Sequence, residues 1–286
     1  MKKYYKADSV RDTYRTLQKN PDASLIAGGQ EIMLDIRHGE HNPDMLIDIS
    51  EINQLNNITK TGDAIHIGAC STYNDLIESP VVRSEFTYLL DAVEDIAGPQ
   101  VRKNGTVGGA LCGADPVYDI PVVLLTLDAS LTVQAGEQVR NIPISEFFTG
   151  RYETVLNSDE ILTKITVPTL PNKSAGTYYS MTPREGDATV IGVCIRLSFS
   201  GANVCEEARI ALTNADSIPK RANKAESTLE GTRVTEEDIE SVVEQIKPEL
   251  NLTSDKTMSK KYRKTVLYRM TDYSINNTKL KITEQI

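Results

Sequence analysis

The chain has 286 residues, which is long for a single hydrophobic core and predicts two or three subdomains. Its content of 40% hydrophobic and 25% charged residues is typical of a soluble globular protein, and its net charge is −9. This acidic balance argues against nucleic acid or an anionic membrane as a partner. The four cysteines show no CxxC spacing, which argues against a disulfide framework and against an iron–sulfur cluster in this chain.

The N-terminal stretch MKKYYKADSV is basic but has no apolar segment of the kind that a secretory signal needs. No apolar run approaches the roughly 18 residues of a membrane-spanning helix. We therefore expect a cytoplasmic protein that does not enter the membrane.

Hydrophobic periodicity and turn residues predict a mixture of helices and strands in the first part of the chain. Helices are expected at residues 9–19, 32–37, 73–78, 85–97 and 119–127. Strands are expected at residues 24–27, 45–49, 64–69, 130–134 and 161–167.

Pro168 and Pro171 indicate a linker, after which three strands precede three helices. The strands are expected at 176–181, 190–199 and 208–213, and the helices at 220–229, 235–246 and 259–276. A run of strands followed by a run of helices is typical of an α+β domain.

The most unusual stretch lies between Ala97 and Pro121 and contains five of the seventeen glycines. At its centre, Thr106-Val107-Gly108-Gly109-Ala110 places two glycines behind a hydroxyl residue. Paired glycines permit positive φ angles and let a ligand lie against the backbone. Successive N–H groups in such a turn can form a nest that binds an anion.

A second glycine pair occurs in Leu25-Ile26-Ala27-Gly28-Gly29-Gln30-Glu31, between an expected strand and an expected helix. Amides at the start of a helix favour a phosphate. A single glycine pair is more often an ordinary turn, but two pairs that each follow a short apolar run favour one shared, phosphate-bearing cofactor.

Two acidic residues beside these turns are candidates for further contacts. Glu31 could accept a hydrogen bond from a ring N–H or a hydroxyl group. Asp119 could accept one from a ribose hydroxyl, or it could cap the helix expected at 119–127. The residues leave these two roles of Asp119 open.

Other kinds of site lack support in the sequence. There is no GxGxxG at the start of a βαβ unit and no GxxxxGK[ST], which argues against Rossmann and P-loop nucleotide sites. His38 and His41 fall in a polar loop, and His66 alternates with apolar residues of a strand. Nothing indicates a hydrolytic triad.

These motifs resemble the FAD-binding subunit of the molybdenum hydroxylases, the family of xanthine dehydrogenase and carbon monoxide dehydrogenase. The resemblance extends over nearly the whole chain. The matching segments are the AGG-x motif at 27–31, the T-x-G-G-N motif at 106–110, and residues 97–102, 114–119, 160–162 and 262–263.

The resemblance implies an α+β fold in which an FAD-binding domain of the PCMH (vanillyl-alcohol oxidase-like) type precedes a smaller α+β domain. The FAD-binding domain is expected at 1–170, with subdomains at about 1–57 and 58–170. The C-terminal domain is expected at 175–286.

The resemblance also implies which residues contact FAD. Residues 27–30 and 106–109 would hold the pyrophosphate, Asp119 the adenosine ribose, and Ile96 would face the isoalloxazine ring. The full implied set is Leu25, Ile26, Ala27, Gly28, Gly29, Gln30, Glu31, Ile32, Ile96, Thr106, Val107, Gly108, Gly109, Ala110, Asp119, Leu162 and Tyr179.

In this family, electrons leave a molybdopterin centre in a large subunit, cross two [2Fe–2S] clusters in a small subunit and reach FAD. FAD then passes them to NAD or another acceptor. The resemblance implies that this chain is the oxidoreductase subunit that binds FAD, and that the large and small subunits are its partners. No catalytic side chain and no metal ligand are expected in this chain.

The sequence departs from the family pattern at two positions. Ala110 stands where the family has Asn, and Tyr179 stands where it commonly has a basic residue. A lost hydrogen bond to a charged group costs roughly 1.5–3 kcal/mol, so weaker FAD binding or a shifted flavin potential is expected. Two alternatives remain: a stand-alone FAD-dependent oxidoreductase on the same fold, and a scaffold subunit without flavin.

Overall fold

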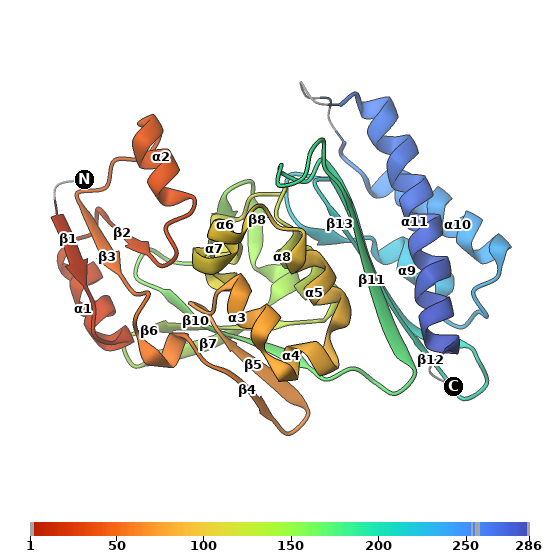
Figure 1. The fold of residues 1–286 in the computed structure, drawn as a ribbon, viewed down its shortest axis with the longest axis horizontal. Helices are drawn as coiled ribbons and strands as arrows, with labels where there is room; N and C mark the ends of the chain where they lie inside the picture. Colours follow the sequence, from red (N-terminus) through yellow and green to blue (C-terminus); the bar gives the residue numbers. More distant parts are fainter. Residues whose placement is uncertain (1–2, 253, 255–257, 285–286) are drawn as a thin grey trace. The chain divides into compact units, whose positions relative to one another are not determined.

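The computed structural model of the chain describes residues 3–252, 254 and 258–284 (Figure 1). The chain forms two compact units, and each unit is assembled from several separate segments. Unit 1 comprises residues 1–83, 98–114 and 129–168, and unit 2 comprises residues 84–97, 115–128 and 169–286.

Unit 1 begins with a small parallel sheet whose strands lie in the order β1-β3-β2. These strands are β1 (Lys3–Lys6), β2 (Ala23–Ile26) and β3 (Met45–Asp48). Helix α1 (Val10–Lys19) connects β1 to β2, and its Ser9 cap accepts a hydrogen bond from the N–H of Asp12. Val10 and Leu17 of this helix pack with Ile47 of β3 in one buried cluster.

Helix α2 (Ile32–His38) follows β2 and differs from α1 because none of its residues is buried. Gly39 ends it with a φ of 77°, a left-handed conformation that suits glycine.

The second sheet of unit 1 is antiparallel, with the order β4-β5-β10-β6-β7. Its central strand β10 runs from Ile161 to Pro168, and the others are β4 (Ile58–Thr61), β5 (Ala64–Gly68), β6 (Ser130–Ala135) and β7 (Gln138–Pro143). A two-stranded ribbon, β8 (Phe148–Gly150) and β9 (Glu153–Thr154), precedes β10.

The short helices α6 (Pro99–Asn104) and α7 (Val107–Gly113) of unit 1 bear on the site described below, and α3 (Tyr73–Glu78) packs against α6. The remaining short elements in the first part of the chain are α4 (Pro80–Glu85), η1 (Asn53–Leu55) and η2 (Ile144–Glu146).

Unit 2 is built on an antiparallel sheet in the order β11-β12-β13-β14. Its strands are β11 (Ser174–Met181), β12 (Ile191–Phe199), β13 (Cys205–Thr213) and β14 (Lys220–Arg221). The helices of unit 2 are α5 (Thr87–Glu94), α8 (Asp119–Thr126), α9 (Asn223–Leu229), α10 (Glu236–Ile246) and α11 (Lys260–Thr283), and η3 (Lys247–Glu249) is a short 3₁₀ turn.

Successive side chains of β11 point to opposite faces of the sheet and therefore contact different helices. Thr177 bonds to Ser274 of α11, with 2.6 Å between the hydroxyl oxygens. The next residue, Tyr178, bonds instead to Asp119 of α8. The sheet therefore has α11 on one face and α8 on the other.

Most of the expected long elements are confirmed, with ends that differ by a few residues. The helix expected at 220–229 is wrong at its start, because Lys220 and Arg221 pair with β13 and the helix begins at Asn223. The helix expected at 259–276 continues to Thr283. The helix expected at 85–97 ends at Glu94, before Ala97 takes a φ of 42°.

A cluster of charges surrounds Asp128, which follows α8 with a φ of 50°. Its carboxylate accepts from Arg196 at 2.8 Å, Arg209 at 2.9 Å and Arg221 at 2.7 Å. Arg196 is only 4% exposed and also donates to the carbonyl of Thr126 at 2.7 Å. Asp128 thus joins the end of α8 to strands β12, β13 and β14.

Replacing Asp128 with Asn is expected to lower the free energy of unfolding by about 3 kcal/mol, because the buried Arg196 loses its nearest counter-charge. Asn tolerates the left-handed backbone, so the change isolates the charge. Urea titration of the variant measures the effect. Glu206→Gln removes one charge from an exposed position of β13 and serves as the control. Equal effects of the two changes would contradict this account of Asp128.

Candidate functional site

The first glycine turn lies in unit 1 between β2 and α2 and presents unpaired backbone donors. Within the described part of the chain, the N–H groups of Gly28, Gly29 and Gln30 donate to no hydrogen bond. Gly29 has a φ of 68°, and the side-chain amide of Gln30 donates to the carbonyl of Gly28 at 3.0 Å. Three consecutive free N–H groups at a half-exposed turn are suited to bind an anion.

The second glycine turn is the beginning of helix α7, and its amides are already used. The hydroxyl of Thr106 caps the helix by accepting from the N–H of Gly109 at 3.0 Å. The N–H of Val107 donates to the carbonyl of Ser71 at 3.0 Å, and that of Gly108 to the carbonyl of Ala69 at 2.8 Å.

The prediction of a bare-amide nest at 106–109 is therefore wrong for residues 107–109. The physical reason is competition: the segment that follows β5 and the hydroxyl of Thr106 take these donors before a ligand can.

The two turns lie against each other within unit 1. A Cβ atom on residue 28 would lie 1.8 Å from the carbonyl oxygen of Asn104 and 3.2 Å from the Cα atom of Gly105. Such distances leave no room for any side chain, so this crossing of the two backbones requires glycine.

The glycines of the second turn have different roles. A Cβ atom on Gly108 would lie 2.5 Å from the carbonyl oxygen of Ala69, so this glycine is needed for packing. Gly109 is exposed, and a Cβ atom there would meet only the side chain of Thr106, at 2.8 Å. Gly109 therefore presents bare backbone to the surface.

The other residues of unit 1 in the implied set occupy varied environments. Ala110 is 4% exposed and Leu162 of β10 is also 4% exposed. Ile26 lies under the first turn, with its Cδ1 atom 3.2 Å from the position of a Cβ on Gly29. Glu31 precedes α2 but forms no capping hydrogen bond with its side chain.

Asp119 belongs to unit 2 and is held by its own neighbours. It is the first residue of α8, whose cap is Tyr118, so the capping hypothesis for Asp119 is wrong. Its carboxylate accepts from the hydroxyl of Tyr178 and, at 2.9 Å, from the hydroxyl of Thr189. The residue is 8% exposed, and burial raises the pKa of its carboxyl group to about 6.

A glycine of β12 makes the pair of Asp119 and Tyr178 possible. A Cβ atom on Gly192 would lie 2.8 Å from the hydroxyl of Tyr178 and 2.9 Å from that of Thr213. The space for the buried hydroxyl group therefore depends on the missing side chain.

Ile96 and Tyr179, the other implied residues in unit 2, lie near its helices. Ile96 follows α5, and its N–H donates to the carbonyl of Val93 at 3.2 Å. The hydroxyl of Tyr179 accepts from the side-chain amide of Asn277 at 3.0 Å, and its ring centre lies 5.1 Å from that of Tyr273. Helix α11 thus holds Tyr179.

Residues that sequence reasoning missed are the partners of these groups. Ala69 and Ser71 carry no signal as acceptors, because any residue can supply a carbonyl. Tyr178 and Thr189 have side chains that suit a buried carboxylate, but only the fold brings them to Asp119.

Within the described ranges, His, Cys, Asp and Glu side chains form no group of three or more that could hold a metal ion. Among the helices that the structure describes, none combines the length and apolar character that crossing a bilayer requires.

Comparison with known proteins accounts for the chain almost from end to end. Residues 1–170 match the model described as the FAD binding domain in molybdopterin dehydrogenase. Residues 176–276 match the CO dehydrogenase flavoprotein C-terminal domain.

Two curated relatives illustrate the similarity. The glyceraldehyde dehydrogenase medium chain of Sulfolobus acidocaldarius is 29% identical over 268 residues, which cover 94% of this chain and 95% of the relative. The carbon monoxide dehydrogenase medium chain of Hydrogenophaga pseudoflava is 32% identical over 242 residues, which cover 84% of each chain.

Solved structures agree. Carbon monoxide dehydrogenase from Hydrogenophaga pseudoflava superimposes with a TM-score of 0.93 at 30% identity over 96% of each chain. Quinoline 2-oxidoreductase from Pseudomonas putida 86 gives a TM-score of 0.92 at 25% identity over 99% of this chain and 98% of that one.

These matches define the chain as a flavoprotein subunit of an oxidoreductase. It belongs to the family of FAD-binding subunits of the molybdenum hydroxylases, as the sequence motifs predict, with an FAD-binding domain followed by a C-terminal domain. FAD is its cofactor, and the partner subunits of this family carry molybdopterin and [2Fe–2S] clusters. The free amides of residues 28–30 fit the diphosphate of this dinucleotide.

The buried carboxyl group of Asp119 is expected to make stability depend on pH. Because its pKa is raised from 3.8 to about 6, the native state binds this proton more tightly than the unfolded chain does. The resulting stabilisation is complete below about pH 4 and is lost as the pH rises through 6. The difference in unfolding free energy between wild type and Asp119→Asn should fall by roughly 3 kcal/mol from pH 3 to pH 7. Chemical unfolding at several pH values measures it, and a constant difference would contradict the assignment.

Proposed function

We propose that this chain is the electron-transfer subunit of a heteromeric molybdopterin-dependent hydroxylase or dehydrogenase. It receives electrons from the [2Fe–2S] clusters of a small partner subunit and passes them through FAD to NAD or another acceptor. A large partner subunit carries the molybdopterin, and the complex is cytoplasmic. The observation that carries the proposal is the row of three unpaired N–H groups in the domain that matches the FAD-binding family.

In the proposed site, the two glycine turns have different roles. The N–H groups of Gly28, Gly29 and Gln30 bind the diphosphate, because oriented backbone donors hold an anion without a charged side chain. The bare backbone of Gly109 gives the cofactor a surface without a protruding side chain. Thr106 keeps that surface rigid by capping α7. When bound, FAD supplies the capacity to exchange electrons, and the protein supplies position and electrostatics.

The remaining residues of the implied set stay part of this proposal. Glu31 and Leu162 lie along FAD, Asp119 binds the adenosine ribose and Ile96 faces the isoalloxazine ring. Each carboxylate oxygen of Asp119 has one bond from Tyr178 or Thr189 and retains a lone pair for a second donor. Tyr179 occupies the position of the family's basic residue.

The names of the relatives support a role common to many substrates. They include medium chains or FAD subunits of dehydrogenases named for glyceraldehyde, carbon monoxide and nicotinate. Related chains thus serve enzymes that act on very different substrates. This fits a subunit that carries electrons better than a subunit that recognises the substrate. We place the substrate site in the molybdopterin subunit.

We also propose the finer description of the fold: a PCMH-type FAD-binding domain at 1–170 with subdomains at about 1–57 and 58–170, and a C-terminal domain at 175–286. The two matched families, which end at 170 and begin at 176, support a boundary in this region.

Gln30→Pro is expected to weaken FAD binding by roughly 10- to 100-fold, because proline removes one of the three N–H donors to the diphosphate. Gln30→Ala is the matched control: it also loses the side chain but keeps the N–H group. Titration of flavin-free protein with FAD, followed by quenching of flavin fluorescence, gives both dissociation constants. Equal affinities would place the diphosphate elsewhere.

The electron-transfer role is tested with the chain and the partner subunits that co-purify with it. Under anaerobic conditions, a substrate of the complex should bleach the visible absorbance of the flavin, because the flavin is reduced. The isolated chain mixed with the same substrate should keep its absorbance. Rapid bleaching of the isolated chain would favour the stand-alone oxidoreductase, and a colourless native complex would favour the scaffold.

A further inference from the structure

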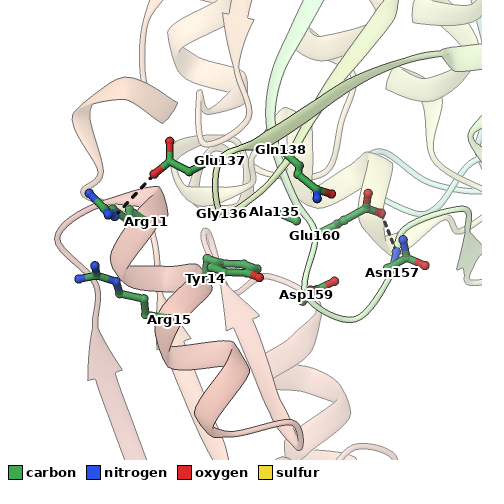
Figure 2. Close-up of a pocket in the computed structure, with 10 residues that line it drawn as sticks. All are labelled: Arg11, Tyr14, Arg15, Ala135, Gly136, Glu137, Gln138, Asn157, Asp159 and Glu160. Carbon is green, nitrogen blue, oxygen red and sulfur yellow. Dashed lines mark hydrogen bonds and ion pairs between the residues drawn. The ribbon is translucent and has the colours of Figure 1, made fainter.

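A second candidate site lies in unit 1, in a cavity of about 630 Å³ (Figure 2). Its walls come from α1, from the turn between β6 and β7, and from the segment before β10. None of the residues proposed to contact FAD lines it. The volume falls within the range of about 300–1,000 Å³ that is usual for small-molecule sites.

One wall carries two arginines of α1. Arg11 and Arg15 are one helical turn apart and share a face, where like charges repel each other. Within the described residues, the guanidinium of Arg15 has no hydrogen-bond or ion-pair partner. Arg11 pairs with Glu137 at 3.8 Å, and both side chains are more than 60% exposed (64% and 86%). An anion bound beside the two guanidinium groups would relieve their repulsion.

The segment before β10 supplies an opposite charge. Asp159 accepts a hydrogen bond at 2.9 Å from the side-chain amide of Gln18, which carries no charge. Its neighbour Glu160 differs, because Arg140 donates to both of its carboxylate oxygens, at 2.6 and 2.7 Å. Asp159 therefore keeps an uncompensated negative charge in the cavity.

Tyr14 lies between these two charges, with Arg15 on one side and Asp159 on the other (Figure 2). Its ring packs on Gly136, where a Cβ atom would lie 3.0 Å from the Cε1 atom of the ring. The glycine lets the ring lie close to the β6–β7 turn, so the cavity has an apolar surface between its two charged walls.

We propose that this cavity binds a small zwitterion of the size of an amino acid or a dipeptide. The carboxylate of the ligand lies at Arg11 and Arg15, its ammonium group at Asp159, and its apolar part against Tyr14. Each uncompensated charge of the cavity then meets an opposite charge. The bound ligand connects α1 to the segment before β10.

Calorimetric titration of the FAD-loaded protein tests the proposal with phenylalanine and with the dipeptide alanyl-phenylalanine as probes. Binding of at least one of them is expected. N-acetylphenylalanine lacks the ammonium group and phenylalanine amide lacks the carboxylate, so each should bind about fivefold more weakly than phenylalanine. The response to the dipeptide distinguishes a free amino acid from a short peptide as the ligand.

Two variants connect each charge of the ligand to its wall. Arg15→Gln should weaken phenylalanine binding about fivefold and leave phenylalanine amide unaffected, whereas Asp159→Asn should leave N-acetylphenylalanine unaffected. Lys19→Gln, an exposed change at the end of α1 outside the cavity, is the control. The proposal is overturned if neither probe binds, if the uncharged N-acetylphenylalanine amide binds equally well, or if both variants bind like wild type.

Discussion

The crossing of two backbones at Gly28 is the constraint on which the proposed FAD site depends. The carbonyl of Asn104 occupies the place where any other residue at position 28 would carry its Cβ atom. This contact fixes the loop between β2 and α2 against the loop between α6 and α7. The amides of residues 28–30 stay free, because no acceptor among the described residues bonds to them.

Backbone donors also resolve an electrostatic conflict. The chain carries a net charge of −9, so its overall field opposes an anionic cofactor. Oriented N–H groups act at short range and need no cationic side chain. The arginines around Asp128 contribute nothing to this purpose, because Arg196, Arg209 and Arg221 all pair with its carboxylate. Their role is to hold α8 to the sheet.

The sequence predicted the elements that depend on local rules, that is, on hydrophobic periodicity and turn residues within one short segment. Periodicity located the long helices and strands, for example α10, which was expected at 235–246 and runs from Glu236 to Ile246. Strand β1 was missed because its residues KYYK show no apolar alternation and all are exposed. At the site, local rules predicted the turn at residues 28–30, where no tertiary partner competes for the amides. They failed at residues 107–109, where the segment after β5 takes the amides of residues 107 and 108 and the hydroxyl of Thr106 takes that of Gly109.

Asp119 is a second residue whose hydrogen-bond partners the sequence did not predict. Its position at the start of α8 suggested a cap or a ribose contact, but its strongest visible interactions are with Tyr178 and Thr189, far away in the chain. Family resemblance supplied a role that spacing alone could not. These hydrogen-bond partners, and the burial that raises the pKa of Asp119, became visible only in the folded structure of unit 2.

The different roles of the two glycine turns can be observed directly at their backbone N–H groups. In protein labelled with ¹⁵N only at glycine, addition of FAD should shift the amide resonances of Gly28 and Gly29 strongly downfield, as expected for N–H groups that gain a charged acceptor. The resonance of Gly108, whose N–H is bonded to Ala69, should show no such shift. A large downfield shift at Gly108 with none at Gly28 and Gly29 would contradict the account.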